Sequence, residues 1–136
     1  MASKLKIYSD GGARGNPGPA AAAFMILSED GTVLKSESKF LGKRTNNQAE
    51  YEALVAALES AMKLGVEVTC YLDSELVCKR LTGEYSVKNP ELKLLWIKVQ
   101  ELKRCFKHVN FINVPRTNKV IQEVDEMVNK RLDAEV

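Results

Sequence analysis

The segment up to Phe40 contains three apolar stretches separated by two groups of turn residues, an order that is compatible with few folds. Leu5 and Ile7 alternate with polar neighbours over residues 4–10, which predicts a short strand. Residues 11–19 are rich in Gly and Pro and predict a turn. Residues 20–28 and 32–40 flank an Asp-Gly pair at Asp30, which is typical of a hairpin. The segment therefore predicts a three-stranded antiparallel meander.

The segments that follow add helices and two more strands. A helix is expected over residues 45–64, with Thr45 or Asn46 as its cap and Gly65 at its end, and then a strand over 66–73. A helix that joins two strands of one sheet is a crossover and implies parallel pairing. This predicts a mixed α/β fold with helices on the sheet faces. The remaining expected elements are helices over 74–81, 89–107 and 120–132 and a strand over 109–114.

Length and composition limit the alternatives. The 136 residues, 45% hydrophobic and 28% charged, predict one globular domain over 1–136. No apolar run is long enough to span a membrane, and residues 1–6 lack the apolar core of a secretory signal. The net charge of +2 is too balanced to indicate nucleic-acid binding by itself. Three cysteines without metal-ligand spacing favour reduced, mostly buried thiols in a cytoplasm.

Two aspartates stand at the ends of predicted strands, each in an aromatic-x-Asp sequence. Asp10 closes residues 8–10 and Asp73 closes residues 71–73. If the two strands are parallel neighbours, both carboxylates lie at the edge of the sheet where open α/β folds bind ligands. The simpler interpretations are a turn aspartate before Gly11 and a helix-capping aspartate before Ser74.

Two further acids lie in or beside apolar helical stripes. Glu50 falls one turn before Leu54 on the apolar side of helix 45–64, where an unpaired carboxylate is costly. Asp125 borders the stripe that contains Ile121 and Val128. The alternatives are that Glu50 flanks the helix start and that Asp125 lies on a solvated edge. Together with Asp10 and Asp73, these acids supply hard oxygen ligands that suit Mg²⁺, or Mn²⁺, rather than zinc. Two such ions would clamp an in-line phosphoryl displacement.

Residues 8–20, 45–50 and 73–74 resemble, in order, the motifs of the type 1 ribonuclease H family. The resemblance covers about residues 4–133 and is closest to compact archaeal and bacterial members. It implies a five-stranded mixed sheet with helices on both faces. It also implies Mg²⁺-dependent endonucleolytic cleavage of the RNA strand of RNA–DNA hybrids, which leaves 3′-hydroxyl and 5′-phosphate ends.

By this resemblance Asp10, Glu50, Asp73 and Asp125 are the catalytic carboxylates that bind the metal. A glycine-rich loop lets backbone groups approach the minor groove closely, and amide side chains can read the 2′-hydroxyl that separates RNA from DNA. Thr45 matches a family position that helps to bind a DNA phosphate. The expected substrate-binding residues are Gly11, Gly12, Ala13, Arg14, Asn16, Thr45, Asn46, Asn47 and Gln48.

The chain departs from the family pattern around the last helix. Many members carry a histidine in the loop that here spans residues 114–119, and Arg116 is the residue best placed to substitute for it. This loop is about two residues longer than usual, so Glu123 or Glu126 competes with Asp125 as the fourth ligand. Residues 81–89 are short and lightly basic where larger relatives carry a basic protrusion, which implies fewer phosphate contacts. His108 and Trp96 are interpreted as structural.

Two other functions fit the same fold. One is a silent module that binds hybrids or duplexes without cutting them, and the other is a metal nuclease of the resolvase kind. The expected partner is an RNA–DNA hybrid acted on by a monomer, and the sequence leaves open whether RNA–RNA duplexes are also cut.

Overall fold

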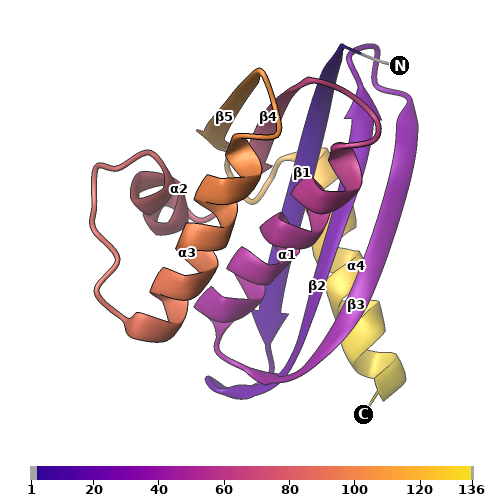
Figure 1. Ribbon diagram of the computed structural model, residues 1–136. Helices are drawn as coiled ribbons and strands as arrows, with labels where there is room; N and C mark the ends of the chain where they lie inside the picture. The colour runs from indigo at the N-terminus through magenta and orange to yellow at the C-terminus, as the bar shows by residue number, and fades with distance from the viewer. Residues whose placement is uncertain (1–2, 136) are drawn as a thin grey trace.

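The computed structural model describes residues 3–135, and Met1, Ala2 and Val136 lie outside it. The expectation that residues 1–6 hold no secretory signal therefore falls partly outside the described residues. The predicted order of strands and helices is confirmed (Figure 1). The strands are β1 (Lys4–Ala13), β2 (Gly18–Ser28), β3 (Val33–Arg44), β4 (Glu67–Leu72) and β5 (His108–Asn113). The helices are α1 (Asn46–Ala61), α2 (Glu75–Leu81), α3 (Pro90–Lys103) and α4 (Lys119–Glu135).

The five strands form one mixed sheet in the order β3-β2-β1-β4-β5. The meander is antiparallel, as expected, since β2 pairs in that sense with both β1 and β3. The crossover through α1 returns the chain beside β1, where β4 pairs with it in parallel, and β5 pairs in parallel with β4. This arrangement puts β1 in the middle of the sheet, with its carboxyl end next to that of β4.

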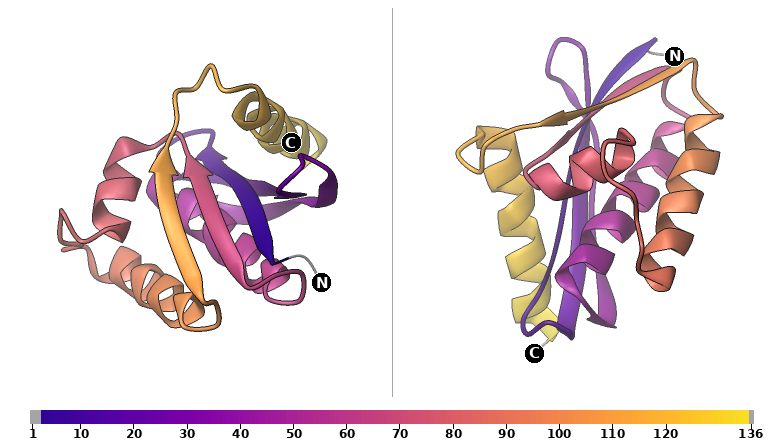
Figure 2. Two further views of the ribbon diagram at one scale, coloured as in Figure 1. Left: turned by 90° about the horizontal axis from the view of Figure 1, so that it is seen from above. Right: turned by 90° about the vertical axis from the view of Figure 1, so that its left-hand side faces the viewer.

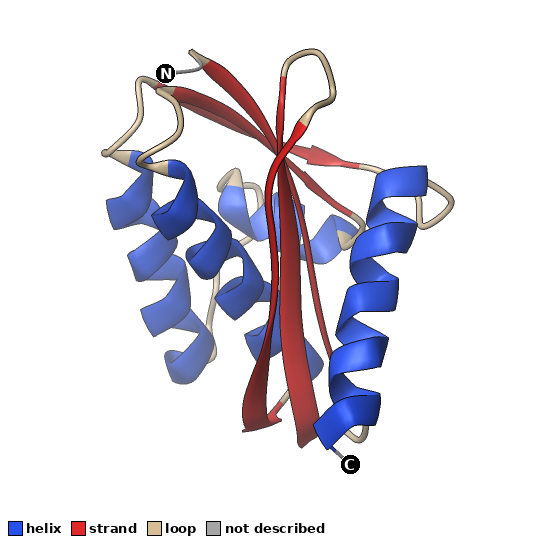
Figure 3. Cartoon of the chain, turned by 90° about the vertical axis from the view of Figure 1, so that its right-hand side faces the viewer, coloured by secondary structure: helices blue, strands red, loops and turns tan. Residues whose placement is uncertain are grey.

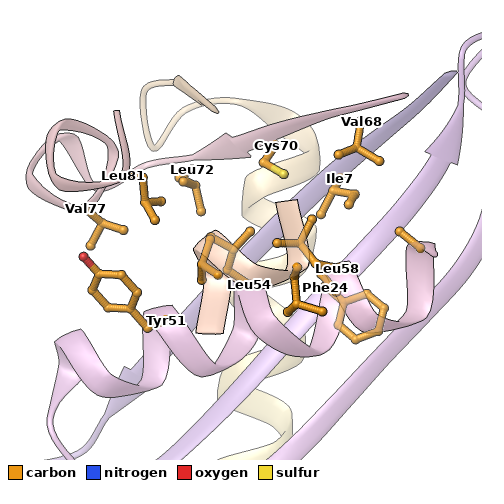
Figure 4. Close-up of a cluster of buried hydrophobic side chains, with 14 of the residues drawn as sticks. Ile7, Phe24, Tyr51, Leu54, Leu58, Val68, Cys70, Leu72, Val77 and Leu81 are labelled. Atoms are coloured by element: carbon orange, nitrogen blue, oxygen red, sulfur yellow. The ribbon is translucent and has the colours of Figure 1, made fainter. Parts of the chain in front are cut away.

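Helices cover both faces of the sheet, which confirms the expected fold class. Figures 2 and 3 show α1, α2 and α3 on one face and α4 alone on the other. The core beneath α1 joins side chains of β1, β2 and β4 to the helices, and Figure 4 shows Ile7, Phe24, Tyr51, Leu54 and Leu58 among them. The core beneath α4 is smaller and contains Tyr8, Ala21, Ala23, Met25, Leu27, Ile121, Val124, Val128 and Leu132.

The first strand is longer than the sequence predicted. It passes Asp10 and continues to Ala13, because Gly11, Gly12 and Ala13 pair with three alanines of β2, at positions 22, 21 and 20. Glycine is rare inside strands, so the sequence pattern favoured a turn throughout residues 11–19. The turn is restricted to residues 14–17. Asp10 is therefore an interior residue of β1 and not its last residue.

Helix ends differ from prediction by a few residues. Thr45 is the cap of α1: its hydroxyl accepts from Gln48 N, and the Gln48 side chain accepts from Thr45 N. Helix α1 ends at Ala61 and α3 ends at Lys103, both earlier than expected. Trp96 packs against the core, half-buried, and donates to the Arg80 carbonyl at 2.9 Å, which fits its structural interpretation. In the described part of the chain, no helix combines the length and the apolar character that crossing a membrane requires.

Candidate active site

Two stacked tyrosines place the two strand aspartates next to each other. Tyr8 of β1 and Tyr71 of β4 are register partners, and their rings stack with centroids 4.6 Å apart. Side chains two residues apart along a strand point to the same face. Asp10 follows Tyr8 by two residues within β1. Asp73 follows Tyr71 by two residues but lies one residue past the end of β4 at Leu72, so it is not the last strand residue that the sequence predicted. Both aspartates therefore start beside the stacked tyrosines. The repeated aromatic-x-Asp sequence is thus explained by parallel pairing.

A glycine brings Glu50 to these aspartates. Gly11 lies so close to α1 that a Cβ added there would be 2.2 Å from the carbonyl carbon of Ala49 and 2.6 Å from Glu50 N. Only glycine permits this approach of strand and helix backbones. The first turns of α1 therefore lie directly against β1, and Glu50 reaches the carboxylates of the strands.

Three carboxylates converge at this point. Asp10, Glu50 and Asp73 each offer an oxygen, and these oxygens lie within 4.8 Å of one another. Burial, together with the charges of Asp73, Asp125 and Glu50, raises the pKa of Asp10 to about 8. Burial and the charge of Asp73 raise the pKa of Glu50 to about 7. The site thus concentrates more negative charge than the protein alone neutralises.

The donor set fits a divalent cation. Glu50 Oε2 is buried and has no hydrogen-bond partner among the described residues. Carboxylate oxygens grouped at this spacing are the hard ligands that Mg²⁺ and Mn²⁺ prefer, and a cation would relieve the repulsion between them. Asp10, Glu50 and Asp73 are the residues that would hold the ion.

Asp125 approaches the three carboxylates from α4, the helix on the other face of the sheet from α1, which supplies Glu50. It lies on α4, is exposed, and is close enough to Asp10 to raise the pKa of that carboxyl by its charge and by a hydrogen bond. Of the three acids considered for this position, Asp125 lines the same cleft as Asp10, whereas Glu126 pairs with Lys130 at 3.1 Å. Of the three acids, Asp125 is the one that lines the cleft, and its role as the fourth ligand stays a prediction.

Arg116 extends over the site from the loop between β5 and α4. Its Nε is 3.7 Å from Asp73 Oδ2, although 90% of its side chain is exposed. Burial raises the pKa of Asp73, and the positive charge of Arg116 opposes this rise. His108, in contrast, is exposed at the start of β5, away from the residues that line the cleft.

The acids lie in a cleft of about 630 Å³ between β1, α2 and α4. Of the expected substrate-binding residues, the cleft is lined by Gly11, Gly12, Ala13, Arg14 and Asn46. Sequence reasoning missed Ser74, Leu76 and Asn129, which also line it. The only sequence signal for Asn129 is its position one helical turn after Asp125.

Of the other expected substrate-binding residues, Asn16, Thr45 and Gln48 form hydrogen bonds within the protein itself. Asn16 Oδ1 accepts from Asn46 N at 3.0 Å, and Asn46 Oδ1 accepts from Ala13 N at 2.8 Å. Gln48 Nε2 donates to Glu91 Oε2 at 2.9 Å, in addition to its part in the cap with Thr45. Asn47 is half-buried in the first turn of α1. These amides thus fix the loop and the helix start against each other.

The raised pKa values predict that the metal-free protein loses stability as pH rises. Each carboxyl binds its proton more tightly in the folded state, with a pKa of about 8 for Asp10 and about 7 for Glu50, than in the unfolded chain, at 3.8 and 4.5. The unfolded state therefore holds fewer protons between about pH 4 and pH 8, and the free energy of unfolding falls across that window. Denaturant titrations with a chelator at pH 5 and pH 8 measure this, and saturating Mg²⁺ should reduce the difference. Equal stability at both pH values would contradict the crowding of these carboxyls.

A central mixed sheet with one acid inside β1 and another just after the adjacent β4, in a cleft suited to divalent ions, defines the class of metal-dependent phosphoryl-transfer enzymes with a ribonuclease H fold. A family model described as "Reverse transcriptase-like" matches residues 8–130. The crystal structure of ribonuclease H1 from Halobacterium salinarum matches with a TM-score of 0.91 and 37% identity over 97% of this chain and 99% of that one. The chain belongs to the type 1 ribonuclease H family.

Two further relatives bear on function and on length. The LC11 ribonuclease H1, solved in complex with an RNA/DNA hybrid, matches with a TM-score of 0.89 and 40% identity over 96% of this chain and 98% of that one. The bifunctional protein Rv2228c of Mycobacterium tuberculosis is 39% identical over 96% of this chain. The chain spans only 36% of the length of that mycobacterial relative.

Proposed function

We propose that the protein is a divalent-metal-dependent endoribonuclease that hydrolyses the RNA strand of RNA–DNA hybrids and leaves 3′-hydroxyl and 5′-phosphate ends. The observation that carries the proposal is the convergence of Asp10, Glu50 and Asp73 within 4.8 Å in an open cleft. A family relative that is solved with an RNA/DNA hybrid supports the choice of substrate.

The chemistry divides between the ions and the chain. Asp10, Glu50, Asp73 and Asp125 would hold Mg²⁺, or Mn²⁺, in a two-ion site, which would supply Lewis-acid chemistry at the scissile phosphate and a more acidic water for in-line displacement. Asp10 and Asp73 hold the centre of the site from adjacent strands, Glu50 closes it from α1, and Asp125 completes it from α4. The cleft along residues 11–14 gives the hybrid's minor groove a backbone surface, where hydrogen bonds to the 2′-hydroxyl would distinguish RNA from DNA.

The cellular setting and the assembly are part of the proposal. The three cysteines are free thiols, two of them buried, which supports action in a reducing cytoplasm. We expect a monomer, because every acid of the site comes from one chain. Sedimentation of the protein with and without a short hybrid tests this expectation.

A cleavage assay with matched substrates tests the function. The protein is incubated with one labelled sequence as RNA–DNA hybrid, RNA duplex and DNA duplex, each with Mg²⁺, Mn²⁺ or chelator. The expected result is metal-dependent cutting of the RNA strand of the hybrid. Hybrid binding without cutting would indicate a silent module, and cutting of DNA would indicate a resolvase-like nuclease. Cutting of the RNA duplex as well would widen the substrate range.

Replacement of Arg116 by Ala is expected to lower kcat at least tenfold, about 1.4 kcal/mol in activation free energy. The reason is its position: an exposed guanidinium beside Asp73 can bind a phosphate oxygen of the substrate or product. Lysine at this position should recover part of the rate, since it keeps the charge but not the planar fork. Single-turnover and steady-state rates together locate the defect. An unchanged kcat in Arg116→Ala would remove this residue from the mechanism.

Asp125→Asn is expected to slow cleavage strongly, because the fourth carboxylate would lose its charge next to Asp10. Glu123→Gln is the matched control, since Glu123 is an exposed acid on the same helix that does not line the cleft. Rates measured across a Mg²⁺ titration compare the two variants. If Glu123→Gln were the slower variant, the assignment of the fourth acid would be wrong.

A further inference from the structure

We infer that Arg14 is a positioning residue for Asp125. Arg14 links α4 to the β1–β2 loop, and the hydrogen bond from Asn129 fixes the Asp125 carboxylate relative to that contact. The consequence for cleavage rests on the proposed function, whereas the consequence for the carboxylate's position does not. The family resemblance implies a substrate contact alone for Arg14, whereas in the structure its guanidinium has partners within the protein.

Arg14 contacts α4 at two acceptors. Its Nη2 donates to Asp133 Oδ1 at 2.6 Å and to the backbone oxygen of Asn129 at 3.3 Å. The right-hand view of Figure 2 shows the β1–β2 turn beside the C-terminal end of α4. A cation is favoured at this end of a helix, where backbone carbonyls carry partial negative charge. The contact therefore fixes the last turns of α4 relative to β1.

Asn129 connects this contact to the site. Its Nδ2 donates to Asp125 Oδ2 at 3.4 Å, and Asp125 in turn interacts with Asp10. The residues connected in this way all line the same cleft: Arg14, Asn129, Asp125 and Asp10. Asp125 is the one acid of the site that α4 supplies. Its place relative to the other three therefore depends on how α4 docks.

The contact between Arg14 and Asp133 contributes little to the free energy of unfolding, so its removal can reveal an effect on position without unfolding the protein. The side chains of Arg14 and Asp133 are 41% and 67% exposed, and ion pairs with such exposure contribute little to the free energy of unfolding. Four buried residues of α4, including Val124 and Val128, already hold the helix on the sheet. Variants that break the contact should therefore fold, and their effect should appear at Asp125.

The test uses Arg14→Ala, Asp133→Ala, the double variant, and the exchanged pair Arg14→Asp with Asp133→Arg. NMR follows the Asn129 side-chain amide and the Asp125 carboxyl carbon during a Mg²⁺ titration without substrate. Each single variant should shift both signals and raise the Mg²⁺ midpoint for Asp125 roughly tenfold. The double variant should do no more than either single one, and the exchanged pair should restore much of the wild-type behaviour. Arg131→Ala is the control, because Arg131 pairs with Glu135 within α4 itself.

Kinetics on the hybrid separate positioning from substrate binding. Both single variants should lower kcat at limiting Mg²⁺ and leave the KM for the hybrid nearly unchanged. The inference is overturned if Asp133→Ala matches wild type in the NMR titration and in kcat while Arg14→Ala raises KM alone, since Arg14 would then act only on the substrate. If the wild-type protein cuts no substrate, the proposed function fails, and the NMR titration still decides the role of Arg14.

Discussion

Replacement of Asp10 by Asn is expected to abolish cleavage and, at the same time, to stabilise the metal-free protein. Asp10 is 9% exposed and crowded by other carboxylates, which raises its pKa to about 8. At pH 8 a neutral amide avoids the cost of holding that charge, and we expect a gain on the order of 2 kcal/mol in the free energy of unfolding. Cleavage should fall by a factor on the order of 10³ or more, because the central ligand of the site is lost.

Two measurements check this expectation. Denaturant unfolding with a chelator gives the stability, and hybrid cleavage gives the activity. Asp30→Asn is the opposite control: hydrogen bonds from Ser28 and Thr32 lower the pKa of Asp30 to about 2, so its loss should destabilise the protein and leave cleavage intact. Residual activity near wild type in Asp10→Asn would contradict the role of Asp10. A lower free energy of unfolding in Asp10→Asn would contradict the repulsion between Asp10 and the neighbouring carboxylates.

Replacement of Gly11 by Ala is expected to damage both the fold and the site. The new methyl carbon would lie 2.2 Å from the Ala49 carbonyl atoms, so α1 must move away from β1 and carry Glu50 with it. We expect a loss of about 3 kcal/mol in the free energy of unfolding, at the upper end for overpacking, because the clash is with backbone. Cleavage at saturating Mg²⁺ should fall at least tenfold.

Gly12→Ala is the matched control for this change. The same methyl group one residue later would lie 3.8 Å from Val128 Cγ1, an ordinary contact. Its free energy of unfolding, from the same denaturant titration, should stay close to that of the wild type. Equal destabilisation by the two alanines would show that strand glycine content, rather than the close approach of α1, explains the requirement at position 11.

Local sequence patterns predicted the elements and much of the site. The hairpin at Asp30, the caps and the apolar periodicity depend on near neighbours and were correct within a few residues. The two aromatic-x-Asp sequences and the position of Glu50 in an apolar stripe predicted that these acids form one site. The structure brings Asp10, Glu50 and Asp73 together.

Features that depend on long-range packing were not predicted. The extension of β1 through Gly11 and Gly12 needs the alanines of β2 as partners, and the reason for Gly11 is the passage of α1 across it. The contact of Arg14 with Asp133 joins residues 119 positions apart and has no local signal. Two amides expected to bind the substrate, those of Asn16 and Asn46, also accept from backbone N–H groups, at Asn46 and at Ala13, which the type of residue alone does not reveal.

Crystals of the protein soaked in Mn²⁺ give the most direct test of the central claim, because anomalous scattering locates the ion independently of any assay. We predict an anomalous peak coordinated by oxygens of Asp10, Glu50 and Asp73, and its loss in crystals of Asp10→Asn. A fully occupied Mn²⁺ elsewhere on the chain, with no density between these three side chains at saturating concentration, would contradict a metal-dependent site at this place.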